Sequence, residues 1–134
     1  MKRVAMLGPG TFSEEATRYL LTDEQYEFVY FKLITEVFQA TAGGLTDWSV
    51  IPIENTIEGS VSLHVDLLVH EYDLPIQAEW VYPISMSLIG YRADLREDDA
   101  DNPTAKYANI KKVVSYSPAF TQCRHFLRTY LPDA

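Results

Sequence analysis

Two short segments carry most of the side chains that could do chemistry. The first is GPGTFSEEA at residues 8 to 16, and the second is IPIENTIEGSV at residues 51 to 61. Each follows an apolar run that is typical of a buried strand, and each is expected to open a helix. Backbone N–H groups and short polar side chains would then meet at one edge of a sheet, where they attract negative charge. The two segments together predict an anion-binding cleft.

The second segment supplies a candidate proton donor. Glu54 and Asn55 come directly after Ile53, at the strand end where ligand sites of open α/β sheets lie. An Asn amide can bind a carboxylate or a hydroxyl, and a partly buried Glu beside it could hold a raised pKa and donate a proton. Gly59 and Ser60 are expected to begin the next helix. The structural alternative for Glu54 is an exposed carboxylate at the end of a strand.

The first segment does not match a nucleotide-binding turn. A GxGxxG pattern would need a third glycine at position 13, which is a serine, and no GK[ST] follows. Thr11 or Ser13 can instead cap a helix start. A strand-to-helix turn with a capping hydroxyl is therefore the structural alternative to a ligand site here.

The remaining reactive side chains do not form a metal-binding pattern. His64 and His70 are six positions apart on a predicted helix, so they project in different directions and cannot act as an i, i+4 ligand pair. We predict surface or half-buried positions for both. Cys123 is predicted to be a buried, inert thiol.

The elements that must position these residues alternate between strand and helix. Apolar runs and helical spacing predict strands at 3–7, 27–31 and 48–53, and helices from Thr11 or Ser13 to about residue 21, at 34–42 and at 59–72. The first helix is expected to turn Ala16, Tyr19 and Leu20 inward, and the second Val37 and Phe38. The βαβαβα order implies a parallel sheet.

The second half of the chain has a different pattern. Residues 76–91 are rich in β-forming types, which predicts an extended segment or two strands. A strand at 112–115 and a helix at 118–130 are expected after that, with Phe120, Leu127 and Tyr130 buried. Between them, a solvated acidic loop is predicted around Asp94, Glu97, Asp98, Asp99 and Asp101.

The composition limits the partners and the location. At 134 residues, with 47% hydrophobic residues, the chain is long enough for one core and short for two complete domains. A net charge of -8 argues against nucleic acid or an anionic membrane as a partner, because both select for clustered Lys and Arg. A single cysteine and the lack of a signal-like or membrane-spanning apolar run predict a soluble, cytoplasmic protein.

A third segment makes the pattern specific. Together with SYSPAFTQC at residues 115 to 123, the two segments resemble, in this order, the motifs of the prephenate dehydratase family. The resemblance implies an α/β fold like that of type 2 periplasmic binding proteins, bilobal, with parallel or mixed sheets and flanking helices. Residues 1–75 would form the first lobe, and residues 76–134 the crossover and an incomplete second lobe.

The resemblance also implies an activity. Members of this family are lyases that convert prephenate to phenylpyruvate with loss of water and carbon dioxide, on the route to phenylalanine, and they use no cofactor. Carried over by position, the catalytic residues would be Glu54, Asn55, Ser115 and Gln122, the last two facing the cleft from the second lobe. The substrate-binding residues would be Thr11, Phe12, Ser13, Thr56, Gly59 and Ser60. Positive charge could come from Arg92 or Arg124.

The chain departs from the family pattern in three places. The first motif is one residue shorter than the usual GPxGTFS, and Tyr116, Ser117 and Pro118 stand where the third motif commonly has His-Pro-Gln. The family's Thr-Arg-Phe motif, whose Thr is regarded as catalytic, and its ACT domain do not occur in these residues. We therefore expect weak binding of prephenate with little turnover.

Three alternatives stay open. The chain could belong to an arogenate dehydratase, which acts on the amino analogue of prephenate. It could be a module that binds such anions without converting them. A homodimer or a higher homo-oligomer, in which another copy completes the second lobe, is also open.

Overall fold

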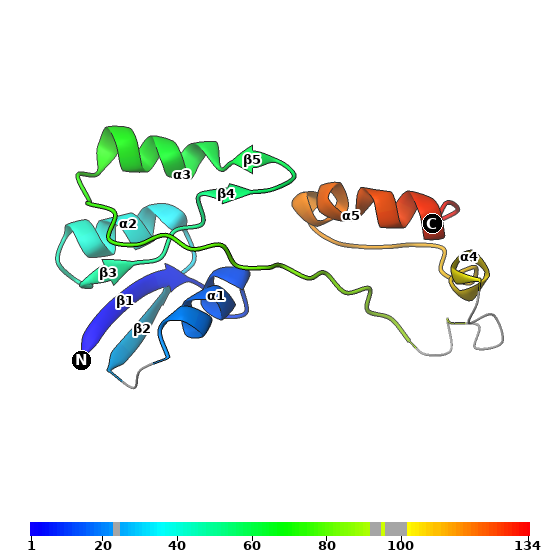
Figure 1. Cartoon of the computed structure of the whole chain (residues 1–134), viewed down its shortest axis with the longest axis horizontal. Coiled ribbons are helices and arrows are strands. Elements are labelled where there is room, and N and C mark those ends of the chain that lie inside the picture. Colours follow the sequence, from blue (N-terminus) through cyan, green and yellow to red (C-terminus); the bar gives the residue numbers. More distant parts are fainter. Residues whose placement is uncertain (23–24, 92–94, 96–101) are drawn as a thin grey trace. The chain divides into compact units, whose positions relative to one another are not determined.

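The computed structural model describes residues 1–22, 25–91, 95 and 102–134 (Figure 1). It divides into two compact units, Met1–Ile84 and Ser85–Ala134, and each is described by itself. In the described part of the chain, no helix is long and apolar enough to cross a membrane. Arg92 and the acidic side chains of the predicted loop lie outside the described residues: Asp94, Glu97, Asp98, Asp99 and Asp101.

A three-stranded parallel sheet forms the centre of the first unit (Figure 1). β1 (Lys2–Leu7) lies between β2 (Tyr26–Phe31) and β3 (Trp48–Ser49), and it runs parallel to both. The predicted strands and their parallel order are confirmed. β3 is shorter than the predicted 48–53: Trp48 and Ser49 pair with β1, and Val50 adds one further hydrogen bond to it.

The middle of β1 is covered on both faces. Val4, Ala5 and Met6 are successive residues, and all three are fully buried. A strand that is buried on both faces has a continuous apolar run instead of an alternating one. The first motif therefore begins at the end of a fully buried strand.

The helix α2 (Ile34–Ala42) supplies much of the core against this sheet. Val37 and Phe38 are fully buried, as the helical spacing predicts. The Phe38 ring stacks on Tyr72 with 5.2 Å between the ring centroids. The core thus joins the sheet to the chain that follows the second motif.

The helix α1 (Phe12–Leu20) begins where the sequence predicts but turns another face inward. Thr17 is fully buried, and its hydroxyl donates to a main-chain carbonyl one turn earlier at 2.6 Å. Tyr19 is 70% exposed and Leu20 is also exposed, so the prediction that they face inward is wrong. Tyr19 lies instead beside the later extended segment, where its ring centroid is 5.6 Å from that of Tyr82.

A hairpin replaces the expected helix start in the second motif. β4 (Glu54–Asn55) pairs antiparallel with β5 (Gly59–Ser60). The helix α3 (Ser62–Asp66) begins only after it and continues as a π-helical turn, η1 (Leu67–Glu71). The predicted helix start at residues 59 and 60 is wrong, because Gly59 has a φ of +79°, in the left-handed region that closes a hairpin turn and not a helix.

The chain is extended over residues 76–91, as predicted, but in the described part of the molecule it pairs with no strand. The second unit contains α4 (Pro103–Lys106) and α5 (Ser117–Tyr130). The strand predicted at 112–115 does not form, since no partner strand lies beside it among the described residues of this unit.

α5 begins one residue before the predicted position and buries fewer apolar side chains than expected. Ala119 is buried, whereas Phe120, Leu127 and Tyr130 are only half-buried. The three candidate core positions are therefore only partly covered. Among the described residues of this unit, the Tyr107 ring after α4 meets Phe126 of the helix, with 5.9 Å between the ring centroids.

Candidate functional site

The start of α1 is organised by the hydroxyl of Thr11. This hydroxyl accepts the Glu14 backbone N–H at 3.2 Å and donates to the Leu7 carbonyl at 2.8 Å. It therefore caps the helix and ties it back to the end of β1. Of the two residues predicted as caps, the structure uses Thr11 and not Ser13.

Three donor groups remain at this helix start. The first N–H groups of a helix have no partner inside it, and here those of Glu14 and Glu15 are taken by Thr11. In the part of the chain that the structure describes, the N–H groups of Phe12 and Ser13 and the Ser13 hydroxyl make no hydrogen bond. Phe12 and Ser13 are half-buried residues.

A hydrogen-bond cluster that the sequence analysis did not predict lies next to them. The Glu14 carboxylate accepts the Gly10 backbone N–H at 2.8 Å, the Tyr30 hydroxyl at 2.7 Å and Arg18 Nε at 2.9 Å. The backbone N–H of Gly10, then Tyr30 and Arg18, lower the Glu14 pKa to about 2. The i, i+4 spacing of Glu14 and Arg18 was visible in the sequence, whereas Tyr30 comes from another strand.

Glu54 lies on the hairpin and not in a pocket. It pairs with Ser60 across β4 and β5, and its side chain is exposed. The partial burial expected of Glu54 is therefore wrong, because a two-residue strand with a single neighbouring strand gives it no cover. Ser60 and Thr56, two of the predicted substrate-binding residues, are also exposed on this hairpin.

Asn55 organises the turn of the hairpin. Its Oδ1 atom accepts the backbone N–H groups of Ile57 at 3.1 Å and Glu58 at 2.8 Å. Its Nδ2 atom donates to the Glu58 carboxylate at 3.3 Å. Asn55 therefore serves the turn with its oxygen and keeps one amide hydrogen for another acceptor.

His64 secures the other side of the same segment. Its Nδ1 atom lies 2.7 Å from the Pro52 carbonyl oxygen, which links α3 to the chain just before β4. His64 is half-buried and His70 is exposed, as predicted. Among the described residues, no group of three or more His, Cys, Asp or Glu side chains could hold a metal ion.

The first two motifs leave the sheet at the same edge. β1 and β3 are neighbouring parallel strands, so their carboxyl ends point the same way. The Val50 N–H donates to the Ala5 carbonyl at 2.9 Å and continues this pairing beyond β3. The first two motifs therefore leave the sheet on the same side, where open α/β sheets bind ligands.

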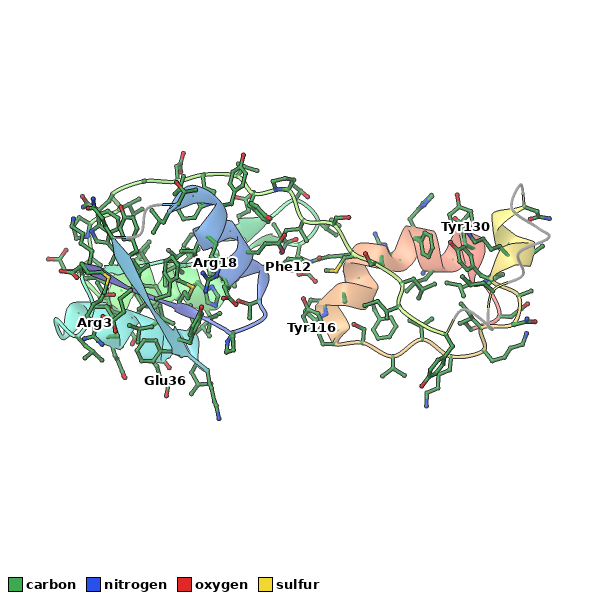
Figure 2. All side chains as sticks on the ribbon, turned by 90° about the horizontal axis from the view of Figure 1, so that it is seen from below. Arg3, Phe12, Arg18, Glu36, Tyr116 and Tyr130 are labelled. Atoms are coloured by element: carbon green, nitrogen blue, oxygen red, sulfur yellow. The ribbon has the colours of Figure 1, made fainter. Side chains whose placement is uncertain are left out.

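The residues of the third motif lie in the second unit. Ser115 is exposed before α5, and Gln122 is half-buried within that helix. Figure 2 shows Tyr116 and Tyr130 at the two ends of α5. Cys123 is half-buried and not fully buried as predicted, and Arg124 is exposed.

The second unit also contains an open hollow of about 210 Å³. Its walls are mostly apolar, and none of the predicted site residues line it. The lining residues are Lys111, Lys112, Val113, Phe120, Leu127, Leu131 and Ala134.

Comparisons with known proteins agree on one family. The family model described as "Prephenate dehydratase" matches residues 4–134. A prephenate dehydratase of Bacillus subtilis (strain 168) is 34% identical over 132 residues, which cover 98% of this chain and 43% of the relative. One of Methanocaldococcus jannaschii is 37% identical over 127 residues, covering 92% of this chain and 40% of the relative.

A solved structure supports the fold. The X-ray structure of prephenate dehydratase from Streptococcus mutans is similar with a TM-score of 0.50 and 31% sequence identity, covering 55% of this chain and 38% of that chain. This chain thus spans less than half the length of the curated relatives named above.

Proposed function

Because the chain belongs to the prephenate dehydratase family, we propose that it supplies the substrate-binding first lobe, and part of the second, of an enzyme that converts prephenate to phenylpyruvate. The observation that carries this proposal is the departure of two polar motifs from the carboxyl ends of neighbouring parallel strands, β1 and β3. One motif has open helix-start donors and the other a polar hairpin. The helix-start donors suit a carboxylate of the substrate, and the hairpin offers an amide hydrogen and hydroxyls.

The proposed chemistry needs few protein groups. The bond between the substrate ring and its carboxylate breaks, carbon dioxide leaves, and the electron pair enters the ring as the hydroxyl departs. The hydroxyl takes one proton and leaves as water. A positioned donor for that proton and hydrogen bonds to the carboxylates are what the protein must supply.

The residues present divide between these tasks. The N–H groups of Phe12 and Ser13 and the Ser13 hydroxyl are proposed to bind a carboxylate, since they make no other hydrogen bond in the described part of the chain. Glu54 is exposed on the hairpin of this chain, so we propose that it donates the proton only when bound substrate covers it. The free amide hydrogen of Asn55, with Ser115 and Gln122, completes the proposed set.

The hydroxyl of Thr11 has a different proposed role. Both of its hydrogen bonds are made within the protein, to Glu14 and Leu7. It therefore supports the helix start and does not need to contact substrate. Thr56, Gly59 and Ser60 are proposed to bind substrate from the hairpin. We also propose that the protein is cytoplasmic and forms a homo-oligomer.

Calorimetric titration of the 134-residue chain with prephenate at neutral pH tests the proposal. We expect binding, and we expect Ser13→Ala to weaken it by about tenfold, because a hydrogen bond to a charged group is lost. Thr129→Ala, which removes an exposed hydroxyl from α5, is the matched control and should bind as the unsubstituted chain does. Equal binding by Ser13→Ala and the control would remove Ser13 from the site.

A product assay tests the chemistry and the substrate. The chain is incubated separately with prephenate and arogenate, and the products are identified by mass spectrometry. Formation of phenylpyruvate from prephenate supports the proposed activity. Formation of phenylalanine from arogenate, with no product from prephenate, would make arogenate the substrate instead. Any turnover should fall by about 10²-fold or more in Glu54→Gln if Glu54 donates the proton. Unchanged turnover in this variant would exclude Glu54 from that role.

A further inference from the structure

We propose that Glu14 is a positioning residue of the first motif, which holds the turn at residues 8–11 so that the free donors of Phe12 and Ser13 are presented to substrate. The proposal rests on the function proposed above. It assigns a role to a side chain that would not itself contact substrate, and it is carried by the contacts of the first unit.

Glu14 connects three separate parts of that unit. One carboxylate oxygen accepts the Gly10 N–H from the turn at 2.8 Å. The other accepts the Tyr30 hydroxyl from β2 at 2.7 Å and Arg18 Nε from the next turn of α1 at 2.9 Å. Arg18 Nη2 also donates to the Tyr30 hydroxyl at 2.7 Å, so the three side chains close a ring of hydrogen bonds.

Tyr30 contacts the turn a second time through its ring. A Cβ atom added to Gly8 would lie 2.8 Å from Cδ1 of Tyr30, which is too close for any side chain at position 8. The turn is therefore packed against the tyrosine ring at its first residue and bonded to Glu14 at its third. Thr11, the last residue of the turn, is tied to Leu7 at 2.8 Å.

Charge balance explains why an acidic residue can stand beside a proposed anion site. A carboxylate at a helix start is favourable for the helix, but it repels an incoming anion. Arg18 pairs with Glu14, and its guanidinium carbon also lies 4.9 Å from the centre of the Phe28 ring. The pair is close to neutral, so the free N–H groups still favour a carboxylate.

Three variants of the 134-residue chain test this role. Glu14→Ala removes every contact of the carboxylate. Glu14→Gln removes the charge but keeps one oxygen that can accept the Gly10 N–H. Glu15→Gln is the matched control, because it makes the same charge change on the same helical turn, while its carboxylate contacts Tyr82 and not the turn.

Two measurements read out the variants. The first is the Gly10 amide resonance and its hydrogen exchange in ¹H–¹⁵N spectra without ligand. We expect the Gly10 amide to shift and to exchange at least tenfold faster in Glu14→Ala, and to stay near its original position in Glu14→Gln and Glu15→Gln. The second is calorimetric binding of prephenate, which should weaken about tenfold in Glu14→Ala and change less than about threefold in the other two.

The outcomes separate the two proposals. If the unsubstituted chain does not bind prephenate, the proposed function fails, and the Gly10 amide alone decides whether Glu14 holds the turn. An unchanged Gly10 amide in Glu14→Ala overturns the positioning role. So does tight prephenate binding by Glu14→Ala, or a loss of binding in Glu14→Gln as large as in Glu14→Ala.

Discussion

At the scale of single residues, the first motif contains a carboxylate whose pKa is strongly lowered. The Glu14 pKa is about 2 in the folded chain, against an ordinary value of 4.5, with the Gly10 N–H as the largest cause and the Tyr30 hydroxyl and Arg18 next. A lowered folded pKa means that the ionised form stabilises the fold. This contribution is present above pH 4.5 and is lost as the pH falls toward 2.

The free energy of unfolding at acid pH should therefore depend on Glu14. We expect the free energy of unfolding of the chain to exceed that of Glu14→Gln at pH 7, and the difference to shrink between about pH 4.5 and pH 2. Urea unfolding at a series of pH values measures it. A difference that stays constant over this range would show that Glu14 is not held as a carboxylate by the fold.

A substitution of Asn55 tests its role in the hairpin turn separately from its proposed role toward substrate. Asn55→Ala removes the acceptor of two backbone N–H groups, those of Ile57 and Glu58. We expect local destabilisation of about 1–3 kcal/mol, since each N–H loses its partner. Hydrogen exchange at residues 57 and 58 should accelerate while exchange in β1 does not. Unchanged exchange at both positions would contradict this role.

At the scale of elements, the Tyr82 side chain connects the extended segment to α1. The Tyr82 hydroxyl donates to Glu15 at 2.7 Å, and this contact raises the Tyr82 pKa. Tyr82→Phe should cost about 0.5–1.5 kcal/mol locally. Tyr82→Ala should cost more, because it also removes the contact with Tyr19.

The rate of limited proteolysis within residues 76–84 measures how firmly Tyr82 holds this segment against α1. We expect cleavage to be faster in Tyr82→Phe than in the unsubstituted chain, and fastest in Tyr82→Ala. Tyr91→Ala is the control, since Tyr91 is 84% exposed and belongs to the other unit. Equal cleavage of all four chains would show that Tyr82 does not hold the segment.

The elements that the sequence predicted share one property. β1, α1, β2 and α2 are each specified by local signals, an apolar run, a capping hydroxyl or a helical stripe. The β4–β5 hairpin was missed because ENTIEGS has the polar and glycine residues of a helix start as well as those of a turn. The choice between them depends on the left-handed backbone of Gly59, which the sequence permits but does not require.

Contacts between distant residues could not be predicted in the same way. Glu14 and Tyr30 are 16 positions apart, and Glu15 and Tyr82 are 67 apart. The first contact depends on the pairing of β2 with β1, and the second on the path of residues 76–84. Similarly, the exposure of Glu54 follows from the hairpin and not from the apolar run before it.

At the scale of the whole molecule, the core of the first unit depends on few large side chains. Phe38 is fully buried and stacks on Tyr72, which links the sheet to the segment after the second motif. Phe38→Ala should cost about 3–5 kcal/mol, a large share of the stability of a small domain. Leu33→Ala, at an exposed position beside α2, should cost less than about 0.5 kcal/mol.

Thermal unfolding followed by circular dichroism compares these two variants with the unsubstituted chain. We expect the midpoint to fall markedly in Phe38→Ala and to change little in Leu33→Ala. Similar midpoints for both variants would mean that the sheet and α2 do not form the cooperative core of this chain.

The unpaired extended segment has a consequence for how the protein behaves in solution. Val81 is 93% exposed and Ile89 is 90% exposed, in a stretch whose backbone, within the described residues, has no strand beside it. Such an edge can pair with that of another molecule, and long-range repulsion from the net charge of -8 opposes this pairing. Colloidal stability should therefore decline as salt screens the charge, so light scattering should increase with ionic strength as well as with protein concentration.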